Sequence, residues 1–410
     1  MSSGAMFLTY DGLLDPLGSS QILPYVLGIA RQPRPMHIVS FEKMDRFDAG
    51  ADRLREQLSR QGIEWTPLSF TTRFGKLGKG WDLLRMYCTA IQLQLRKKFR
   101  VIHCRSYQAM QVGCLLSRMT GATTIFDMRG LWVDERIDGG LWSPSKWTDR
   151  LAYRLYKYIE RHLLASASHV VVLTNRVAPE LSRLSPDVDL SITVIPCCAD
   201  FDHFRIASPD ARQSVRAEIG VGSGALLISY LGSLGTWYML DEMLQFFSAA
   251  AGRWDEVHLL FITKDWRAEH EARVELMGLA PARRRIHVRS ATRDQVPALL
   301  GASDVMLSFI KPAYSKIASS PTKFAEALAL GVPVISNVGI GDVEQITREL
   351  DAGGVFDLAD PAAMAQVVED LDLICQKGGK RLRDRARPKL GLEVAARAYR
   401  DVYRSVERMI

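Results

Sequence analysis

The sequence predicts an α/β protein of two domains, each with a parallel β-sheet enclosed by helices. Short, unbroken runs of apolar and β-branched residues alternate with amphipathic stretches, as expected of parallel strands covered on both faces. The 410 residues also exceed what one ordinary hydrophobic core holds, and the alternation restarts after a break near residues 190–205. We therefore expect two sheets rather than one.

In the first half, five apolar runs are predicted to be strands: residues 7–10, 36–41, 101–104, 123–127 and 170–174. The stretches between them have the period of helices and cover residues 21–31, 51–61, 83–98, 110–119 and 146–165. Repeated strand, helix and strand is typical of a Rossmann-like sheet with right-handed crossovers.

The second half repeats this pattern. Its predicted strands are residues 226–231, 259–263, 286–288, 305–309 and 334–336, and its predicted helices are residues 240–251, 294–300, 323–330, 361–373 and 392–410. The predicted domains are residues 1–190 and 191–390, followed by a last helical segment, 391–410. Two Rossmann-like domains are expected to face each other across a cleft, with chemistry in the loops after the strands, where open sheets bind ligands.

Composition is that of a soluble globular enzyme, with 47% apolar and 24% charged residues. The sequence shows neither an apolar run of membrane-spanning length nor a signal peptide, so we expect a cytoplasmic protein. The six cysteines form no C-x-x-C pair and no zinc-ligand spacing, so no metal is expected. For the adjacent Cys197 and Cys198, packing at a domain junction is favoured over redox activity.

The net charge of +7 arises in the first half, where residues 1–190 hold 26 Lys and Arg against 18 Asp and Glu. Basic clusters lie at residues 96–100 and at Arg73, Lys76 and Lys79. They are either solvated surface or a face for an anionic partner, such as anionic lipid or a lipid-linked phosphate. Nucleic acid is not expected, because no reading motif accompanies the charge.

Two glycine-bearing loops follow predicted strands. In the first, residues 11–20, Gly18 and Ser19 are predicted to contact a phosphate or sugar donor, although a plain turn would use the same residue types. In the other, residues 232–238, Gly232, Ser233 and Gly235 could cradle a diphosphate. Neither loop has the G-x-G-x-x-G spacing of a dinucleotide site.

A charged loop at residues 126–136 holds five ionisable side chains around one tryptophan. Such density directly after a buried strand is costly unless the groups bind something. Asp127 and Arg129 come first after the strand and are predicted to be catalytic. Internal ion pairs that hold the loop are the alternative.

The most informative loop covers residues 319–331. Proline near the helix start and Gly331 beyond its end delimit a short helix. Ser320, Thr322 and Lys323 bring hydroxyls, free N–H groups and a cation to the start of this helix, which suits an anion. Glu326 lies one turn later and could accept both ribose hydroxyls of a nucleotide. The alternative is a surface Lys–Glu pair on a capped helix.

This region resembles the GT-B glycosyltransferases, specifically the large retaining family 4. The shared motif is a glutamate, a helix of small residues, a glycine and Pro-Val-Ile, here Glu326 to Ile335 after Ser-Pro-Thr-Lys. Residues 101–104 and the linker at 194–204 also match the family. Residues 10–21 and 126–132 resemble bacterial exopolysaccharide transferases, so the resemblance covers essentially the whole chain.

The resemblance implies a nucleoside-diphosphate sugar as co-substrate, bound by the C-terminal half, and no metal or other cofactor. Glu326 would hold the ribose, and Thr322 and Lys323 the diphosphate. The N-terminal half would take the acceptor, and the last helix would return to pack on it. Positive groups and helix ends would stabilise the departing diphosphate. The resemblance also implies that the transferred sugar retains its anomeric configuration.

The sequence departs from the family in three places. Ala318 stands where the first glutamate of E-x7-E is usual, so the donor sugar is left open. The 232–238 loop lacks the usual Arg and Lys; Ser233 and Tyr238 stand about there, and Lys264 and Lys323 are predicted to replace the charge. Asp127 and Arg129 occupy the region of the family's histidine.

The predicted function is sugar transfer to a lipid-linked or polysaccharide acceptor at the inner face of the plasma membrane. Aromatic residues that indicate either membrane contact or core packing are Trp142, Trp147, Tyr153, Tyr156 and Tyr158. One alternative is a nucleotide-sugar epimerase with the same fold. The other is a degenerate, non-catalytic transferase that acts as a partner or scaffold, suggested by the missing Glu, Arg and Lys.

Overall fold

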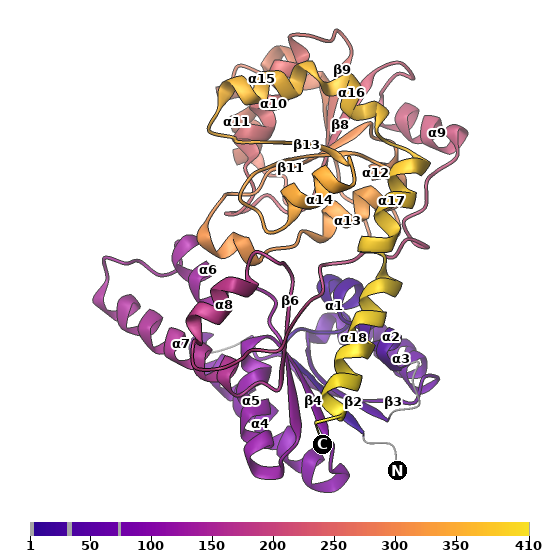
Figure 1. Cartoon of the computed structure of the whole chain (residues 1–410). Helices are drawn as coiled ribbons and strands as arrows, with labels where there is room; N and C mark the ends of the chain where they lie inside the picture. Colours follow the sequence, from indigo (N-terminus) through magenta and orange to yellow (C-terminus); the bar gives the residue numbers. More distant parts are fainter. Residues whose placement is uncertain (1–3, 31–34, 73–74, 410) are drawn as a thin grey trace. The chain divides into compact units, whose positions relative to one another are not determined.

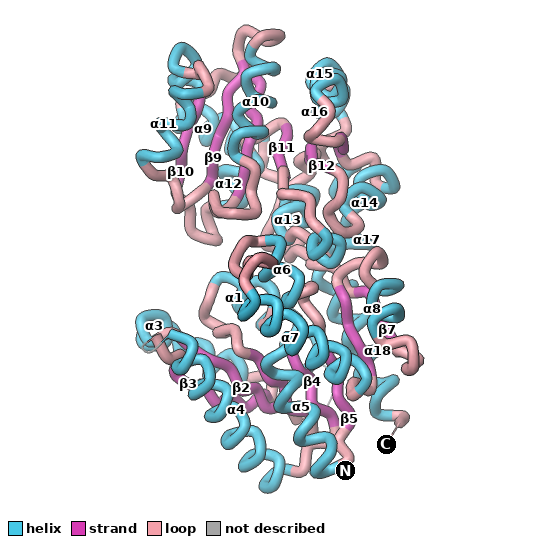
Figure 2. Tube along the Cα trace, turned by 90° about the vertical axis from the view of Figure 1, so that its left-hand side faces the viewer, coloured by secondary structure: helices cyan, strands magenta, loops and turns pink. Residues whose placement is uncertain are grey.

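The computed structural model describes residues 4–30, 35–72 and 75–409, without the side chain of Lys76 (Figure 1). Three features predicted from the sequence lie outside this part: the end of the 21–31 helix, the cluster at Arg73 and Lys76, and residue 410. The chain divides into two compact units, Met1–Pro196 with Leu392–Ile410, and Cys197–Gly391. Each unit has a parallel sheet flanked by helices (Figure 2), which confirms the predicted fold class.

The sheet of the first unit has seven strands in the order β3-β2-β1-β4-β5-β6-β7. All neighbours are parallel; Leu8, for example, pairs with Val39 on one side and Cys104 on the other. The strands are β1 (Ala5–Thr9), β2 (Met36–Glu42), β3 (Ile63–Ser69), β4 (Val101–Arg105), β5 (Thr123–Asp127), β6 (His169–Val172) and β7 (Ile192–Val194). The two edge strands, β3 and β7, were not predicted, because neither is an unbroken buried run.

The helices of this unit differ from the prediction in several places. The helix at Ala178–Leu184 was not predicted, and the helices that end at Ser59 and Lys97 begin before the predicted residues 51 and 83. The helix predicted from residue 21 is two short helices, which separate at Ile22, and part of the charged loop is helical as α6. The helices are α1 (Pro16–Gln21), α2 (Leu23–Ala30), α3 (Met44–Ser59), α4 (Gly75–Lys97), α5 (Ser106–Thr120), α6 (Trp132–Asp138), α7 (Trp147–Ala165) and α8 (Ala178–Leu184).

The C-terminal helix α18 (Leu392–Glu407) packs against α2 of the first unit. The two helices approach closely at Gly28, where a Cβ would lie 2.5 Å from Cβ of Ala396. Arg400 donates a hydrogen bond of 2.7 Å to the carbonyl of Gly28. Tyr399 and Tyr403 on the same helix are buried, so the last segment of the chain completes this core.

The second unit has six parallel strands in the order β10-β9-β8-β11-β12-β13. They are β8 (Leu226–Leu231), β9 (Val257–Ile262), β10 (Ile286–Arg289), β11 (Val305–Ser308), β12 (Val334–Asn337) and β13 (Gly353–Phe356). β13 was not predicted, because it begins with two glycines. A Cβ on Gly353 would lie 1.9 Å from the carbonyl oxygen of Val334, so close strand pairing requires glycine there.

The helices of the second unit include four that were not predicted: α9, α11, α14 and α17. The stretch predicted as one helix over 361–373 is α15 and α16. The helices are α9 (Pro209–Ile219), α10 (Leu240–Ala251), α11 (Ala268–Leu276), α12 (Val296–Gly301), α13 (Thr322–Ala329), α14 (Val343–Glu349), α15 (Pro361–Glu369), α16 (Leu371–Gln376) and α17 (Lys380–Leu390), with 3₁₀ turns η1 (Ala280–Arg285) and η2 (Tyr314–Ala318).

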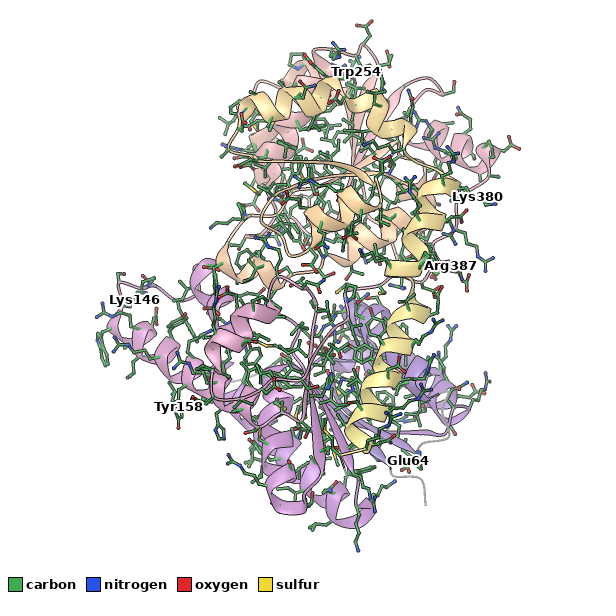
Figure 3. All side chains as sticks on the ribbon, in the orientation of Figure 1. Glu64, Lys146, Tyr158, Trp254, Lys380 and Arg387 are labelled. Atoms are coloured by element: carbon green, nitrogen blue, oxygen red, sulfur yellow. The ribbon has the colours of Figure 1, made fainter. Side chains whose placement is uncertain are left out.

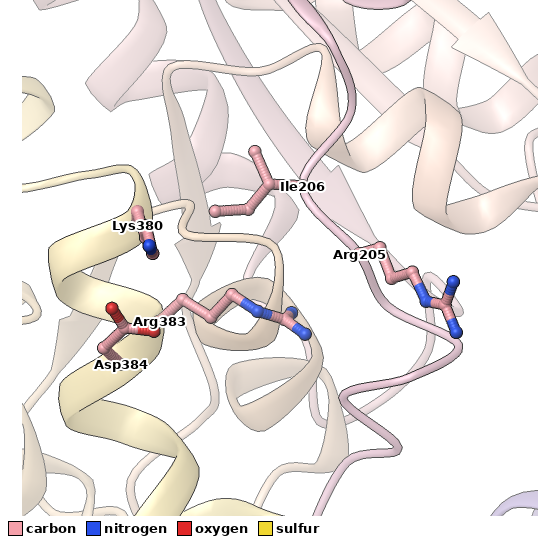
Figure 4. A pocket seen from close by; sticks show the side chains of 5 residues that line it. All are labelled: Arg205, Ile206, Lys380, Arg383 and Asp384. Carbon is pink, nitrogen blue, oxygen red and sulfur yellow. The ribbon is translucent and has the colours of Figure 1, made fainter.

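Helix α13 is fixed at both ends. Before its start, Ser320 Oγ accepts a hydrogen bond of 3.1 Å from the backbone N–H of Cys197. Beyond its end, Gly331 adopts a left-handed conformation, and its carbonyl accepts a 2.7 Å bond from the N–H of Gly379. Arg383 on α17 donates to the carbonyl of Ala329. Arg383 also lines a surface pocket together with Arg205, Ile206, Lys380 and Asp384 (Figure 4). These contacts hold both ends of α13, which begins after the carboxyl end of β11.

Substitution of Gly28 tests the contact between α2 and α18. Gly28→Ala should lower the free energy of unfolding by about 1–3 kcal/mol, because the added methyl group overpacks against Ala396. The matched control is Gly80→Ala in α4, where a Cβ meets no atom within 4 Å, and which should leave stability unchanged or raise it by up to about 1 kcal/mol. Urea denaturation measures both; equal effects would contradict the proposed packing constraint.

Candidate functional site

The strongest candidate site lies where the start of α13 meets the loop after β8. Lys323 Nζ lies 4.3 Å from the ring centroid of Tyr238 and 5.6 Å from that of Tyr230. Gly232 has a φ of 137°, and a Cβ there would lie 1.7 Å from Lys323 Nζ. The structure thus brings Gly232 and Lys323 together, and it explains the glycine by the space that the lysine occupies.

Glu326 is buried one turn further along α13, with 9% of its surface exposed. Arg293 Nη1, from the segment after β10, lies 3.9 Å from Glu326 Oε1. Burial raises the pKa of Glu326 to about 7, although Arg293 and Lys323 act in the opposite direction. A buried carboxylate is not part of a surface Lys–Glu pair, so that alternative is excluded.

The 232–238 loop is held by hydrogen bonds on both sides. Tyr230 Oη donates to the carbonyl of Ser233 (2.6 Å), and the N–H of Leu234 donates to Asp265 (3.3 Å). At the other end, the N–H of Lys311 donates to the carbonyl of Trp237 (2.8 Å). The loop therefore presents the adjacent rings of Trp237 and Tyr238 in fixed positions.

Lys316 contributes a second cation to this loop. It is buried in η2, and its Nζ lies 3.6 Å from the ring centroid of Trp237. Trp237 and Tyr238 thus each face a lysine from the segment that follows β11. Neither Lys316 nor Arg293 was predicted from the sequence. For Lys316, the only indication in the sequence was that it is the one charged residue in the run 312–322. Arg293 looks like an ordinary surface residue in the sequence.

The other predicted donor residues lie in different surroundings. Thr322 is the first residue of α13 and is half-buried, whereas Lys264 is exposed directly after β9. A Cβ on Gly235 would meet no atom within 4 Å, so packing does not require glycine there. Ala318, where the family has its first glutamate, is buried in η2.

In the first unit, Asp127 is the centre of a buried polar cluster at the end of β5. Its carboxylate lies 3.2 Å from Arg105 Nη1 and 3.4 Å from Arg129 Nη1. It also accepts a hydrogen bond of 3.1 Å from Tyr399 on α18, and His103 Nε2 lies 3.7 Å away. Burial raises the pKa of Asp127, but Arg129, His103 and Arg105 outweigh it and hold that pKa well below its ordinary value.

This cluster fits the alternative of internal ion pairs for the charged loop. A carboxylate with a strongly lowered pKa is a poor proton acceptor near neutral pH. Asp127 is therefore suited to orienting Arg105 and Arg129, and a catalytic role for Asp127 and Arg129 stays a prediction. Arg105 was not predicted; its Nε is buried and makes no hydrogen bond in the described structure, and the next residue, Ser106, has a φ of 71°.

The first glycine loop packs on itself. A Cβ on Gly18 would lie 1.8 Å from the carbonyl oxygen of Gly12, so glycine is needed for the close turn. Ser19 Oγ donates to the carbonyl of Pro16 (3.2 Å). Buried Glu42 accepts the N–H of Leu13 (2.8 Å) and so fixes the loop from β2. Donor contact by Gly18 and Ser19 stays a prediction.

The aromatic residues around α7 fall into two sets. Trp142 and Tyr156 pack against Trp132 of α6, with centroid distances of 6.2 and 5.4 Å. Tyr153 donates a hydrogen bond of 2.8 Å to Asp134. Trp147 and Tyr158 are exposed. Core packing therefore accounts for part of the set only.

The described residues contain neither a cluster of metal ligands nor a membrane-spanning helix. Over 4–30, 35–72 and 75–409, three or more His, Cys, Asp or Glu side chains nowhere gather in a way that could hold a metal ion. Within the same residues, every helix is too short or too polar to cross a bilayer. The absence of a cofactor stays a prediction.

Comparison with known proteins bears on both units. Residues 25–198 match a glycosyl transferase 4-like domain, and residues 225–372 match the glycosyl transferases group 1. Over 230 residues, the chain is 27% identical to 2-deoxystreptamine glucosyltransferase from Streptomyces kanamyceticus. That alignment spans 53% of this chain and only 56% of the relative.

Two solved structures share the fold over nearly the whole chain. Sucrose-phosphate synthase from Thermosynechococcus elongatus has a TM-score of 0.69 and 14% identity, with 100% of both chains covered. Anabaena HepE in complex with UDP-glucose has a TM-score of 0.69 and 15% identity, with 98% of this chain and 100% of that chain covered. The resemblance found in the sequence is thus confirmed, while retention and a role in exopolysaccharide synthesis stay predictions. The chain belongs to the group 1 glycosyltransferases of GT-B fold, with a glycosyl transferase 4-like domain before the group 1 domain.

Proposed function

We propose that the chain transfers a sugar from a nucleoside-diphosphate sugar to a lipid-linked or polysaccharide acceptor, with retention of anomeric configuration. The observation that carries the proposal is the pair of charges on α13, with Lys323 beside the β8 loop and Glu326 buried one turn away. A cation at a helix start suits a diphosphate, and a carboxylate suits two ribose hydroxyls.

The positive charge expected to bind the donor's diphosphate comes from a different part of the sequence than is usual in the family. In place of basic residues within the 232–238 loop, Lys316 and Lys323 reach the loop from η2 and α13. Lys323 is half-buried and faces Tyr238, so its ammonium group is oriented before a ligand arrives. We assign Lys323 to the diphosphate and Lys316 to holding Trp237 in position.

The reaction then needs little reorganisation of the protein. The bond between the anomeric carbon and the β-phosphate oxygen breaks, and the acceptor oxygen bonds to that carbon on the same face. The acceptor hydroxyl proton passes to the leaving diphosphate. Lys323 and the N–H groups at the start of α13 offset the charge that develops on this leaving group, so no metal ion is required.

The first unit is the proposed acceptor domain. Its residues 1–190 carry 26 basic against 18 acidic side chains, which favours an anionic acceptor or surface. Arg105 and Arg129, which both pair with Asp127, lie at the carboxyl ends of β4 and β5. We propose that the protein works in the cytoplasm and lies peripherally on the inner face of the plasma membrane.

The nucleotide to test first is UDP, because the Anabaena HepE structures hold UDP and UDP-glucose. A nucleotide-sugar epimerase is separated from a transferase by NMR of the donor alone: epimerised sugar without acceptor would support the epimerase. The buried Ala318 is the observation that favours a non-catalytic scaffold, because the family's first glutamate is missing there.

Nucleotide binding should stabilise the protein. UDP or another matching nucleoside diphosphate at about 100-fold excess over its Kd should raise the free energy of unfolding by about 3 kcal/mol. Lys323→Met should remove most of this gain, whereas Lys380→Met, at an exposed lysine on α17 of the same unit, should keep most of it. Thermal unfolding with a nucleotide panel measures the effect; stabilisation by none of them would favour the scaffold.

Turnover should separate the roles of the two α13 residues. Lys323→Ala should lower kcat by about 100-fold or more, because the leaving diphosphate loses its cation. Glu326→Ala should mainly raise KM for the donor, by about 10-fold or more, because ribose hydrogen bonds are lost. Release of nucleoside diphosphate measures the kinetics of both variants, with Lys380→Ala, at an exposed lysine on α17, as the control. Near-normal kinetics in both variants would overturn the assignment.

Glu326 should also make stability depend on pH. Its pKa is about 7 in the folded protein against 4.5 ordinarily, so the folded state binds the proton more tightly. Relative to Glu326→Gln, wild-type stability should therefore fall as pH rises from about 4.5 to about 7, by about 3 kcal/mol in total, and stay level above. Urea denaturation across this range measures it, with exposed Glu275→Gln on α11 as control.

The same residue links proton release to nucleotide binding. Ribose hydroxyls that donate to the carboxylate favour its charged form, so binding near pH 6–7 should release more protons from wild type than from Glu326→Gln. Calorimetry in buffers of different ionisation enthalpy detects this. A pH-independent difference in stability would contradict the raised pKa of Glu326. Equal proton release by both proteins would contradict the placement of the ribose at Glu326.

A further inference from the structure

Helix α7 carries a stripe of large apolar side chains that point into solvent. Trp147, Leu151, Leu155 and Tyr158 are 67%, 60%, 54% and 70% exposed. Their spacing of four, four and three residues places them on one face of the helix. Figure 3 shows Tyr158 on the outer side of this helix. Exposed apolar residues are ordinary when scattered, whereas a continuous stripe marks an interaction surface.

The opposite face of α7 explains why the stripe is not part of the core. Tyr153 and Lys157 both bond to Asp134 of α6, at 2.8 and 2.9 Å. Leu163 and Leu164 are buried, and the helix packs on α5 and α6. The helix is thus anchored by its inner face, and the stripe is held outward as a rigid surface.

The charges beside the stripe have one sign. Arg150, Arg154 and Arg161 are exposed along one border of it, and Lys146 is exposed just before the helix (Figure 3). On a helical wheel these arginines fall within about one-sixth of a turn of the apolar positions.

The two acidic residues of α7 do not offset this charge. Glu160 is buried and pairs with Lys157, and Asp149 accepts the N–H of Ser143 at 2.9 Å near the helix start. The exposed face of α7 therefore combines apolar side chains with cations and has no exposed carboxylate of its own.

We propose that this face of α7 is the surface by which the protein lies on an anionic lipid bilayer. The apolar stripe would enter the headgroup region while the arginines meet lipid phosphates, as in helices that lie in a membrane interface. A second copy fits less well, because a symmetric contact would bring two rows of arginines together. The inference deepens the proposed function and rests on it for the membrane setting, but not for the nucleotide site.

Co-sedimentation with lipid vesicles tests the proposal. At about 50 mM salt, wild-type protein should bind phosphatidylcholine vesicles with about 30% phosphatidylglycerol, and bind pure phosphatidylcholine much more weakly. Arg150→Gln/Arg154→Gln/Arg161→Gln should lower the partition coefficient by about 100-fold, and Leu151→Gln/Leu155→Gln by about 10-fold or more. Leu276→Gln/Leu373→Gln, at two similarly exposed leucines of the second unit, should bind like wild type.

Two further measurements make the outcome decisive. Thermal unfolding should show that all variants are folded, because the altered side chains are exposed. UDP should raise the unfolding temperature of each variant as much as it raises that of wild type. Loss of nucleotide stabilisation with intact vesicle binding would refute the donor site and leave the α7 proposal standing. The α7 proposal would be overturned if wild-type protein did not bind anionic vesicles, or if the arginine and leucine variants bound as well as wild type. A dimer in sedimentation velocity that the leucine variant abolishes would also overturn the α7 proposal.

Discussion

The approach of Lys323 to Gly232 is the contact on which the candidate site of the second unit depends. A lysine can stand beside the β8 loop only because the residue there lacks a Cβ, and because Tyr238 presents its ring to the ammonium group. The helix that carries Lys323 is in turn fixed by Ser320 at its start and by Gly331 and Arg383 at its end. A cation, a helix start and a buried carboxylate thus occupy one rigid element, which suits the proposed electrostatic stabilisation of a diphosphate.

The first unit is organised around a buried negative charge, the carboxylate of Asp127, whereas the candidate site of the second unit is organised around the positive charge of Lys323. Asp127 holds two arginines at the carboxyl edge of the sheet, and Tyr399 reaches it from a helix almost at the other end of the sequence. The C-terminal segment is therefore part of the structure that positions this cluster. The first unit therefore holds two kinds of cation. Those of the Asp127 cluster are buried or half-buried and oriented by that carboxylate, whereas those on the outward face of α7 are exposed beside apolar side chains.

The departures from the family pattern make sense in this arrangement. In the β8 loop, Ser233 and Tyr238 stand about where the family usually has basic residues. Lysines from η2 and α13 face the rings of Trp237 and Tyr238 in this loop. The positive charge is kept near the loop while its source in the sequence changes. Ala318 is buried in η2, so a carboxylate at that position would have to be accommodated by different packing of the same turn.

By itself, the sequence determined the strand and helix alternation of both halves, because fully buried parallel strands such as β5 and β8 are unbroken apolar runs. It also identified the α13 segment, where proline, lysine, glutamate and glycine have fixed spacing. Edge strands, Arg105, Arg293 and Lys316 were missed, because their roles depend on neighbours distant in sequence. Only the tertiary structure decided that Glu326 is buried, that Gly18 is needed by its own loop, and that the α7 stripe faces solvent, since a helical period shows which residues share a face but not what covers it.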